Sequence, residues 1–221
     1  MSASSTTAVT TTRYGHAFWE FMWRSAGIQS AGLFIIAYFI CGNDGDRTRT
    51  LIAAAISGLA ILNLMWFAAA IRTTLADAGQ GGWGSAATAS SAAVGASLLL
   101  LITIGAALAY SISGSADREF TSSLDGIVSA GFVMSSFPRA MLIMSGSLGL
   151  WRAGLISNGL FTLGVAAIVL VLAGGTTWLD SGFWSPEGVY SCVVSPVIGL
   201  IWVVVVSVLL LVRIPGSRSG W

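Results

Sequence analysis

The sequence lacks lysine altogether, and it contains one histidine, His16, and two cysteines among 221 residues. Without a lysine amine the chain cannot form the Schiff base that retinal and pyridoxal cofactors require. One histidine excludes a bis-histidine haem or a histidine-built metal centre within a single chain. Two cysteines do not complete a structural zinc site without other ligands. We therefore expect no cofactor and no metal.

Charge is also scarce. Charged residues make up 9% of the chain and hydrophobic residues 55%, whereas a soluble domain carries about 25% charged residues. The mean hydropathy of +0.85 predicts a protein that contacts the lipid bilayer, and the absence of a long charge run argues against nucleic-acid binding. The sequence has no paired carboxylates, no Ser–His or Cys–His combination and no H-E-x-x-H motif, which favours a non-catalytic protein.

Long apolar stretches separated by polar loops predict an all-α polytopic membrane helix bundle with six transmembrane helices. About 20 apolar residues cross a hydrocarbon core of about 30 Å. We expect a disordered N-terminal tail over residues 1–13, a six-helix transmembrane domain over residues 14–215, and a short C-terminal tail over residues 216–221. The predicted helices cover approximately residues 21–41, 51–71, 86–110, 123–150, 155–173 and 186–212.

The arginines are distributed unevenly between the two sides of this bundle. One side holds Arg13, Arg24, Arg72, Arg152, Arg213 and Arg218. The opposite side holds only Arg47, Arg49 and Arg118, where acidic residues outnumber them. The positive-inside rule counts basic residues and therefore places both termini in the cytoplasm, in a multi-pass protein of the cytoplasmic (inner) membrane.

The apolar stretch over residues 123–150 would be roughly 42 Å long as one helix, which exceeds the hydrocarbon core of about 30 Å. Pro138 predicts a kink, because proline removes one backbone hydrogen bond and clashes with the carbonyl of Met134. Ser122 and Asp125 have the Ser-x-x-Asp spacing of a capping box. This spacing predicts that the helix begins there.

Arg139 lies about 22 Å along this predicted helix, beyond the membrane midplane. An arginine at that depth costs at least ~2.5–3.5 kcal/mol on insertion scales, so it should face protein or water and be paired. Two interpretations remain open. In the first, Pro138 bends the helix and Arg139 snorkels toward the inner headgroups. In the second, Arg139 lines a polar site between helices, and the expected members of that site are Asn63, Ser135 and Ser136.

Small residues recur every four positions in the helix predicted over residues 86–110, at Ala87, Ser91 and Gly95. This spacing places them on one helix face. Membrane helices associate through such faces because small side chains allow the backbones to approach closely. We expect this face to pack against a neighbouring helix and the helix itself to be central in the bundle.

The two cysteines fall on the same predicted side of the membrane. Cys41 ends the first predicted helix and Cys192 lies near the start of the last one. In an oxidising compartment they would form a disulfide if their Cα atoms came within about 7 Å. The alternative is two unpaired thiols at apolar helix ends, which free cysteine tolerates well.

Residues 150–155, Leu-Trp-Arg-Ala-Gly-Leu, join one apolar helix to the next. This run is similar to a connection in uncharacterised multi-pass membrane proteins of high-GC bacteria. The resemblance covers this hairpin and implies a bacterial multi-pass membrane protein without implying an activity.

Two functions are consistent with these observations. The small-residue face and the shortage of buried ionisable groups favour a non-catalytic integral membrane protein that acts as an accessory or packing subunit of a membrane assembly. Its partners would be lipid and either further copies of itself or other membrane protein subunits. The alternative is a small transporter or channel with a polar site around Arg139 on the helix kinked at Pro138.

Overall fold

A computed structural model describes the backbone of residues 6–41, 46–111 and 118–213, and the side chains of residues 21–41, 46–110 and 123–212. Over these ranges the chain is helical between its connecting turns and contains no strand. The helices are α1 (Thr6–Cys41), α2 (Arg47–Asp77), α3 (Gly81–Ser111), α4 (Arg118–Met134), α5 (Ser136–Arg152), α6 (Asn158–Gly174), the π-helix η1 (Tyr190–Val194) and α7 (Ser195–Arg213).

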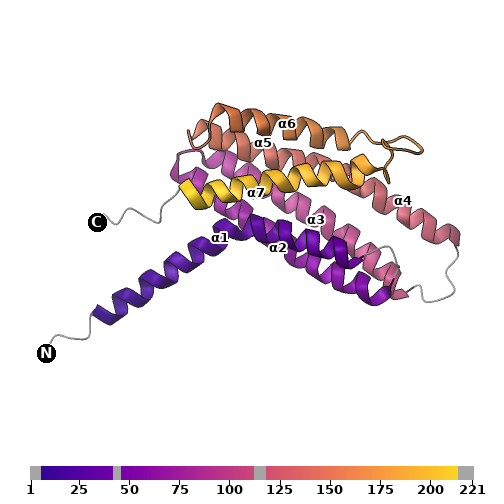
Figure 1. Cartoon of the computed structure of the whole chain (residues 1–221), viewed down its shortest axis with the longest axis horizontal. Helices are drawn as coiled ribbons and strands as arrows, with labels where there is room; N and C mark the ends of the chain where they lie inside the picture. Colours follow the sequence, from indigo (N-terminus) through magenta and orange to yellow (C-terminus); the bar gives the residue numbers. More distant parts are fainter. Residues whose placement is uncertain (1–5, 42–45, 112–117, 214–221) are drawn as a thin grey trace.

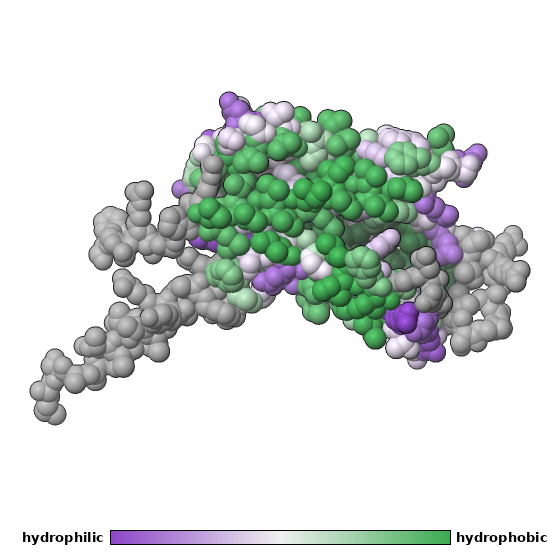
Figure 2. All heavy atoms as spheres, in the orientation of Figure 1, coloured by the Kyte–Doolittle hydropathy of each residue, from purple (hydrophilic) through white to green (hydrophobic). Residues whose placement is uncertain are grey.

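Five helical stretches of the described chain are long and apolar enough to cross a membrane. They are Phe21–Cys41, Arg47–Asp77, Gly81–Tyr110, Ser123–Arg152 and Tyr190–Val212. The apolar helix α6 has 17 residues, which is the lower end of the length needed to span a bilayer, about 17–25 residues. Apolar side chains cover most of the face in Figure 2, and hydrophilic residues gather mainly toward its ends.

Several helix boundaries differ from the sequence prediction. The first helix begins at Thr6, inside the tail for which we predicted disorder, and its N-terminal half projects away from the other helices (Figure 1). The last helical stretch begins at Tyr190 rather than at residue 186, because residues 186–188 form a turn and a bend. The predicted C-terminal tail, residues 216–221, lies outside the described residues.

The predicted helix over residues 123–150 is two helices, α4 and α5, interrupted at Ser135. The first of them starts at Arg118, so Ser122 and Asp125 lie inside a helix rather than at its cap. The capping pattern is a local signal, and it was wrong here because the helix continues upstream of it. An aspartate does cap α2: the Asp46 carboxylate accepts a hydrogen bond from the Thr48 amide at 3.1 Å.

The helices pack in a closed order, in which each contacts the next: α1, α2, α3, α5, α6, α7 and again α1. The centre of this bundle is apolar. Phe67 on α2 meets the Trp202 ring on α7 edge-on, with ring centroids 6.2 Å apart. The Trp202 indole N–H donates to the Ser147 hydroxyl on α5 at 2.9 Å, so its polar atom is satisfied inside the core.

Small residues make these close helix contacts. The predicted face of α3 lies against α2: Ala87 is buried, and a Cβ added to Gly95 would be 3.1 Å from the Ile61 side chain. The hydroxyl of Ser91 donates to the carbonyl of Leu64 at 3.3 Å. The hydroxyl of Ser30 on α1 similarly donates to a carbonyl of α2 at 2.8 Å. Such bonds tie helices together where no water competes.

Gly27 marks the crossing of α1 with α2 and α7. A Cβ at this position would lie 2.9 Å from atoms of both Phe67 and Val203 and would overlap the Ser207 side chain. The three helices therefore meet at a distance that only glycine permits.

We predict that Gly27→Ala lowers the free energy of unfolding by about 1–3 kcal/mol, because overpacking forces the neighbours apart. Gly32→Ala on the same helix is the matched control, since its Cβ would meet nothing within 4 Å. It should be neutral or stabilising by up to about 1 kcal/mol through helix propensity. Thermal unfolding of both variants in detergent measures the difference, and equal midpoints would contradict the close crossing.

Candidate functional site

The interruption between α4 and α5 is a gap in the helical hydrogen-bond ladder. The Ser135 amide donates to the Gly131 carbonyl at 3.0 Å, and the next described ladder bond runs from the Arg139 amide to the Ser135 carbonyl at 3.2 Å. Pro138 is the third residue of α5 and has no N–H, so the carbonyl of Met134 has no helical donor. Proline thus explains why the chain breaks three residues before it.

Arg139 supplies donors to the carbonyls at this break. Its Nε donates to the Ser135 carbonyl at 3.2 Å, and its Nη2 donates to the Phe132 carbonyl at 3.2 Å and to the Ser136 hydroxyl at 3.0 Å. The Ser135 hydroxyl also donates to the Phe132 carbonyl, at 2.6 Å. The guanidinium carbon lies 4.9 Å from the centre of the Phe132 ring, a cation–π contact.

The Arg139 side chain runs from α5 back toward α4. This is the direction in which helical side chains point, toward the N-terminus, and it is where the freed carbonyls lie. The interpretation in which Arg139 snorkels toward the predicted inner side would need its side chain to point to the Arg152 end of α5, whereas its hydrogen bonds run the opposite way.

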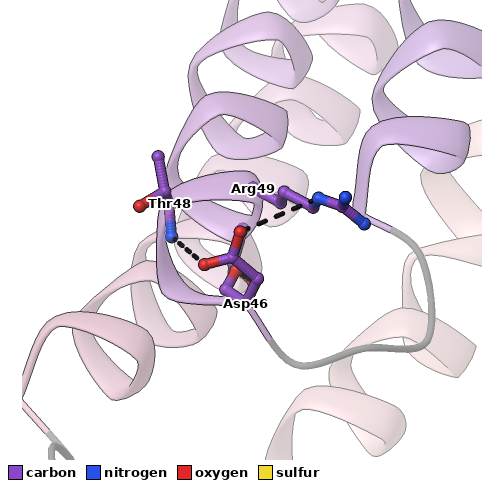
Figure 3. A network of polar contacts seen from close by, with 4 residues as sticks. Asp46, Thr48 and Arg49 are labelled. Carbon is purple, nitrogen blue, oxygen red and sulfur yellow. Dashed lines mark hydrogen bonds and ion pairs between the residues drawn. The ribbon is translucent and has the colours of Figure 1, made fainter.

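The positive charge of Arg139 has no carboxylate within 4.0 Å in the part of the chain that the structure describes. A guanidinium has five N–H donors. Three are used in the hydrogen bonds above, and the two on Nη1 have no acceptor among the described residues. At the surface the situation is different: Figure 3 shows exposed Arg49 with its Nε 3.7 Å from the carboxylate of Asp46.

Contacts with α3 show which part of that helix Arg139 lies beside. A Cβ on Gly131 would lie 2.6 Å from the Leu101 side chain, and one on Gly149 would lie 2.9 Å from Trp83. Arg139 is eight residues from the first contact and ten from the second, which is about 12 Å and about 15 Å along a helix. Leu101 and Trp83 belong to one apolar span of α3. Arg139 therefore lies beside the middle of that span and is half-buried.

Two other irregular segments meet the break. Gly174 ends α6, and a Cβ there would be 3.1 Å from the Ser136 hydroxyl and 2.6 Å from the Ser195 hydroxyl. Ser195 begins α7 directly after η1; its side chain is fully buried, and its hydroxyl has no hydrogen-bond partner among the described residues. Pro196 follows, and its missing N–H removes a helical donor, which accounts for the local π-helix.

The structure unites part of the predicted polar site. Ser135 and Ser136 both contact Arg139, but Asn63 does not share these bonds: its amide donates to the Leu59 carbonyl on its own helix at 3.0 Å. Sequence reasoning missed Ser195, whose only signal was the proline after it. Non-helical backbone at membrane depth occurs where protein buries it or where it lines a cavity, so this cluster is the candidate site.

The cysteines are separate from this cluster. Cys41 and Cys192 are both free and both exposed, so the structure has the second of the two predicted alternatives rather than a disulfide.

The chemistry available at the break is the binding of an anionic group. It offers one guanidinium, serine hydroxyls and no carboxylate or imidazole among the described residues that would act as an acid or base. No set of three His, Cys, Asp or Glu side chains in the described ranges could hold a metal ion. Comparison with protein-family models, with curated proteins and with solved structures finds no match for this chain.

We predict that Pro138→Ala joins α4 and α5 into one straighter helix, because alanine restores the N–H that the Met134 carbonyl lacks. The distance between spin labels at positions 125 and 152, both of which are exposed, measures this straightening. Both native cysteines are first replaced by serine. The separation of the labels should rise toward about 40 Å, the length of a continuous helix of that many residues, with a narrower distribution. Ser136→Ala leaves the proline in place and serves as control. An unchanged distance in Pro138→Ala would contradict this cause of the break.

Proposed function

We propose that the protein is a non-catalytic accessory subunit of a membrane assembly in the cytoplasmic membrane of a bacterium. In this proposal α6 is a sixth span and both termini are cytoplasmic. The observation that carries the proposal is Arg139: a guanidinium beside the middle of an apolar span, with two N–H groups and its charge uncompensated by the described residues.

An arginine inside the hydrocarbon core of a bilayer is costly, by at least ~2.5–3.5 kcal/mol at the centre of a helix, unless it is paired. Hydrogen bonds to the carbonyls of Phe132 and Ser135 offset part of this cost, but carbonyl oxygens do not neutralise a full charge. A carboxylate from outside the chain would do so. A subunit that is incomplete in this way gains stability when it assembles.

A second copy of the chain is an unsuitable source of that carboxylate. Each of the nine acidic residues lies in a predicted connection or close to the end of a predicted span, and none is placed near the middle of one. They are Glu20, Asp44, Asp46, Asp77, Asp117, Glu119, Asp125, Asp180 and Glu187. The deepest in the helix that carries the site is Asp125, which is 14 residues, or about 21 Å, before Arg139. The proposal is therefore a hetero-oligomer.

The second candidate is a small transporter or channel centred on Arg139. It is favoured by the meeting of a broken helix, a helix end and a π-helix at one depth, which is how transporters build binding sites. Against it, the cavity of about 240 Å³ between α5, α6 and α7 is lined almost entirely by apolar side chains, and Arg139 is not among them. A solute path would need polar lining, so the geometry favours the subunit.

The topology can be tested with the native thiols. Cys41 ends α1 and Cys192 lies in η1, at the same end of the bundle (Figure 1), and both are exposed. We predict that a membrane-impermeant maleimide labels both from outside in intact cells, whereas a cysteine introduced at Arg152 is labelled only after permeabilisation. The reverse pattern would overturn the orientation, and labelling of only one native cysteine would overturn the six-span count.

Co-purification tests the subunit role. Removing one partner of a buried ion pair costs about 3–5 kcal/mol, so Arg139→Gln should reduce recovery of the native partner in mild detergent by roughly tenfold or more. Arg152→Gln is the matched control, because Arg152 is exposed at the end of the same helix and lies over the Trp83 ring at 5.9 Å. Equal recovery with Arg139→Gln, together with loss of a measured solute flux, would favour the transporter.

A further inference from the structure

We propose that the opening between α1 and α7 is the docking site for one transmembrane helix of another protein, and that this helix carries an aspartate or glutamate within its apolar span. The inference rests on the proposed function and names its partner by chemistry. It is argued from the shape of the opening, the direction of Arg139 and the polarity of the surroundings.

The opening begins where α1 and α7 separate. They touch at Gly27 and Val203, but one turn away on α7, at Gly199, a Cβ would meet nothing within 4 Å. The same change occurs on α1. Gly27, Ala31 and Tyr38 share one helix face; Ala31 is buried, whereas Tyr38 is 70% exposed.

The figures show this divergence. In Figure 1, α1 and α2 run away from α7 between their crossing and the end of α1. Figure 2, in the same orientation, shows a hollow in the surface between α7 and the pair α1 and α2, on the side of the crossing toward the end of α1.

Arg139 lies on the side of α5 that faces α7. Seven residues further along, on the same helix face, a Cβ on Gly146 would be 2.6 Å from the Trp202 ring. On the other side of Arg139, Ser136 lies with Ser195 around Gly174. Arg139 is thus level with the part of α7 between Ser195 and Trp202, which is where Gly199 leaves open space. Its Nη1 is the part of the guanidinium that has no acceptor among the described residues.

The apolar surroundings of Arg139 favour a membrane helix over a hydrated solute as the ligand of this opening. The side chains nearest the break that are exposed are Met134 and Phe137, which are apolar. A membrane helix satisfies its own backbone and presents apolar side chains to such a surface. Gly199 allows its close approach. A carboxylate at mid-helix would make a charge-assisted pair with Nη1, and each charge would otherwise be exposed to lipid.

A synthetic helix tests this directly. The full chain is reconstituted in phosphatidylcholine vesicles with a 23-residue leucine–alanine helix that has either glutamate or leucine at its centre. Energy transfer from a dye on Cys41, in the Cys192→Ser background, reports association. We expect the glutamate helix to bind roughly tenfold more tightly than the leucine helix or better. Arg139→Gln should abolish that preference, and Arg152→Gln should keep it.

Further outcomes separate the alternatives. Gly199→Leu fills the opening without touching Arg139, and it should weaken binding of both helices; unchanged binding would overturn the site. Equal binding of the two helices, or a preference that survives Arg139→Gln, would overturn the acidic partner. If anionic phospholipid in the vesicles removes the preference, a lipid headgroup is the occupant and the inference fails. The proposed subunit role is tested separately. If co-purification of the native partner still depends on Arg139, that role holds even when this docking site is overturned.

Discussion

The break in the helical ladder before Pro138 imposes the main constraint on this bundle, because buried backbone acceptors need donors inside the protein. Arg139 supplies donors within one turn. Its side chain turns back across the break and donates to the carbonyls of Phe132 and Ser135, and the Ser135 hydroxyl adds a further bond to Phe132. The predicted helix over residues 123–150 therefore becomes two helices, α4 and α5, which hydrogen bonds from the Arg139 side chain connect.

Small residues decide where the bundle is tight and where it is open. At Gly27, Gly146 and Gly164 the helices approach so closely that an added Cβ would overlap a neighbouring side chain, and Trp202 fills the centre between them. Beyond this level α1 and α7 diverge (Figure 1), and a Cβ on Gly199 would meet nothing within 4 Å. Glycine thus has two effects in this bundle. Where a neighbouring helix packs on it, as at Gly27, the helices are in close contact; where none does, as at Gly199, it leaves open space.

The charges of the bundle belong to two different environments. Exposed arginines are partnered in ways that cost the chain little: Arg49 lies near Asp46, and Arg152 lies over the ring of Trp83. Such surface contacts contribute about 0–1 kcal/mol each. Arg139 is half-buried, and the described chain offers it carbonyls, a hydroxyl and an aromatic ring but no negative charge. The proposal that the protein assembles with a partner rests on this contrast and not on the number of arginines.

The sequence alone predicted the all-helical character and an irregularity at Pro138, and five of the six spans that it predicted contain helices long and apolar enough to cross a membrane, because hydropathy, span length and proline geometry are local properties. It predicted a kink in one helix, whereas the structure has two helices. It also placed Ser135 and Ser136 beside Arg139, since neighbours within one helix turn follow from spacing. It placed Asn63 in the same site incorrectly, and it missed Ser195, because contacts between helices depend on their rotation and register. Only the tertiary structure decided which way Arg139 points, what covers it and where α1 leaves α7, since these depend on how six faces pack against one another at once.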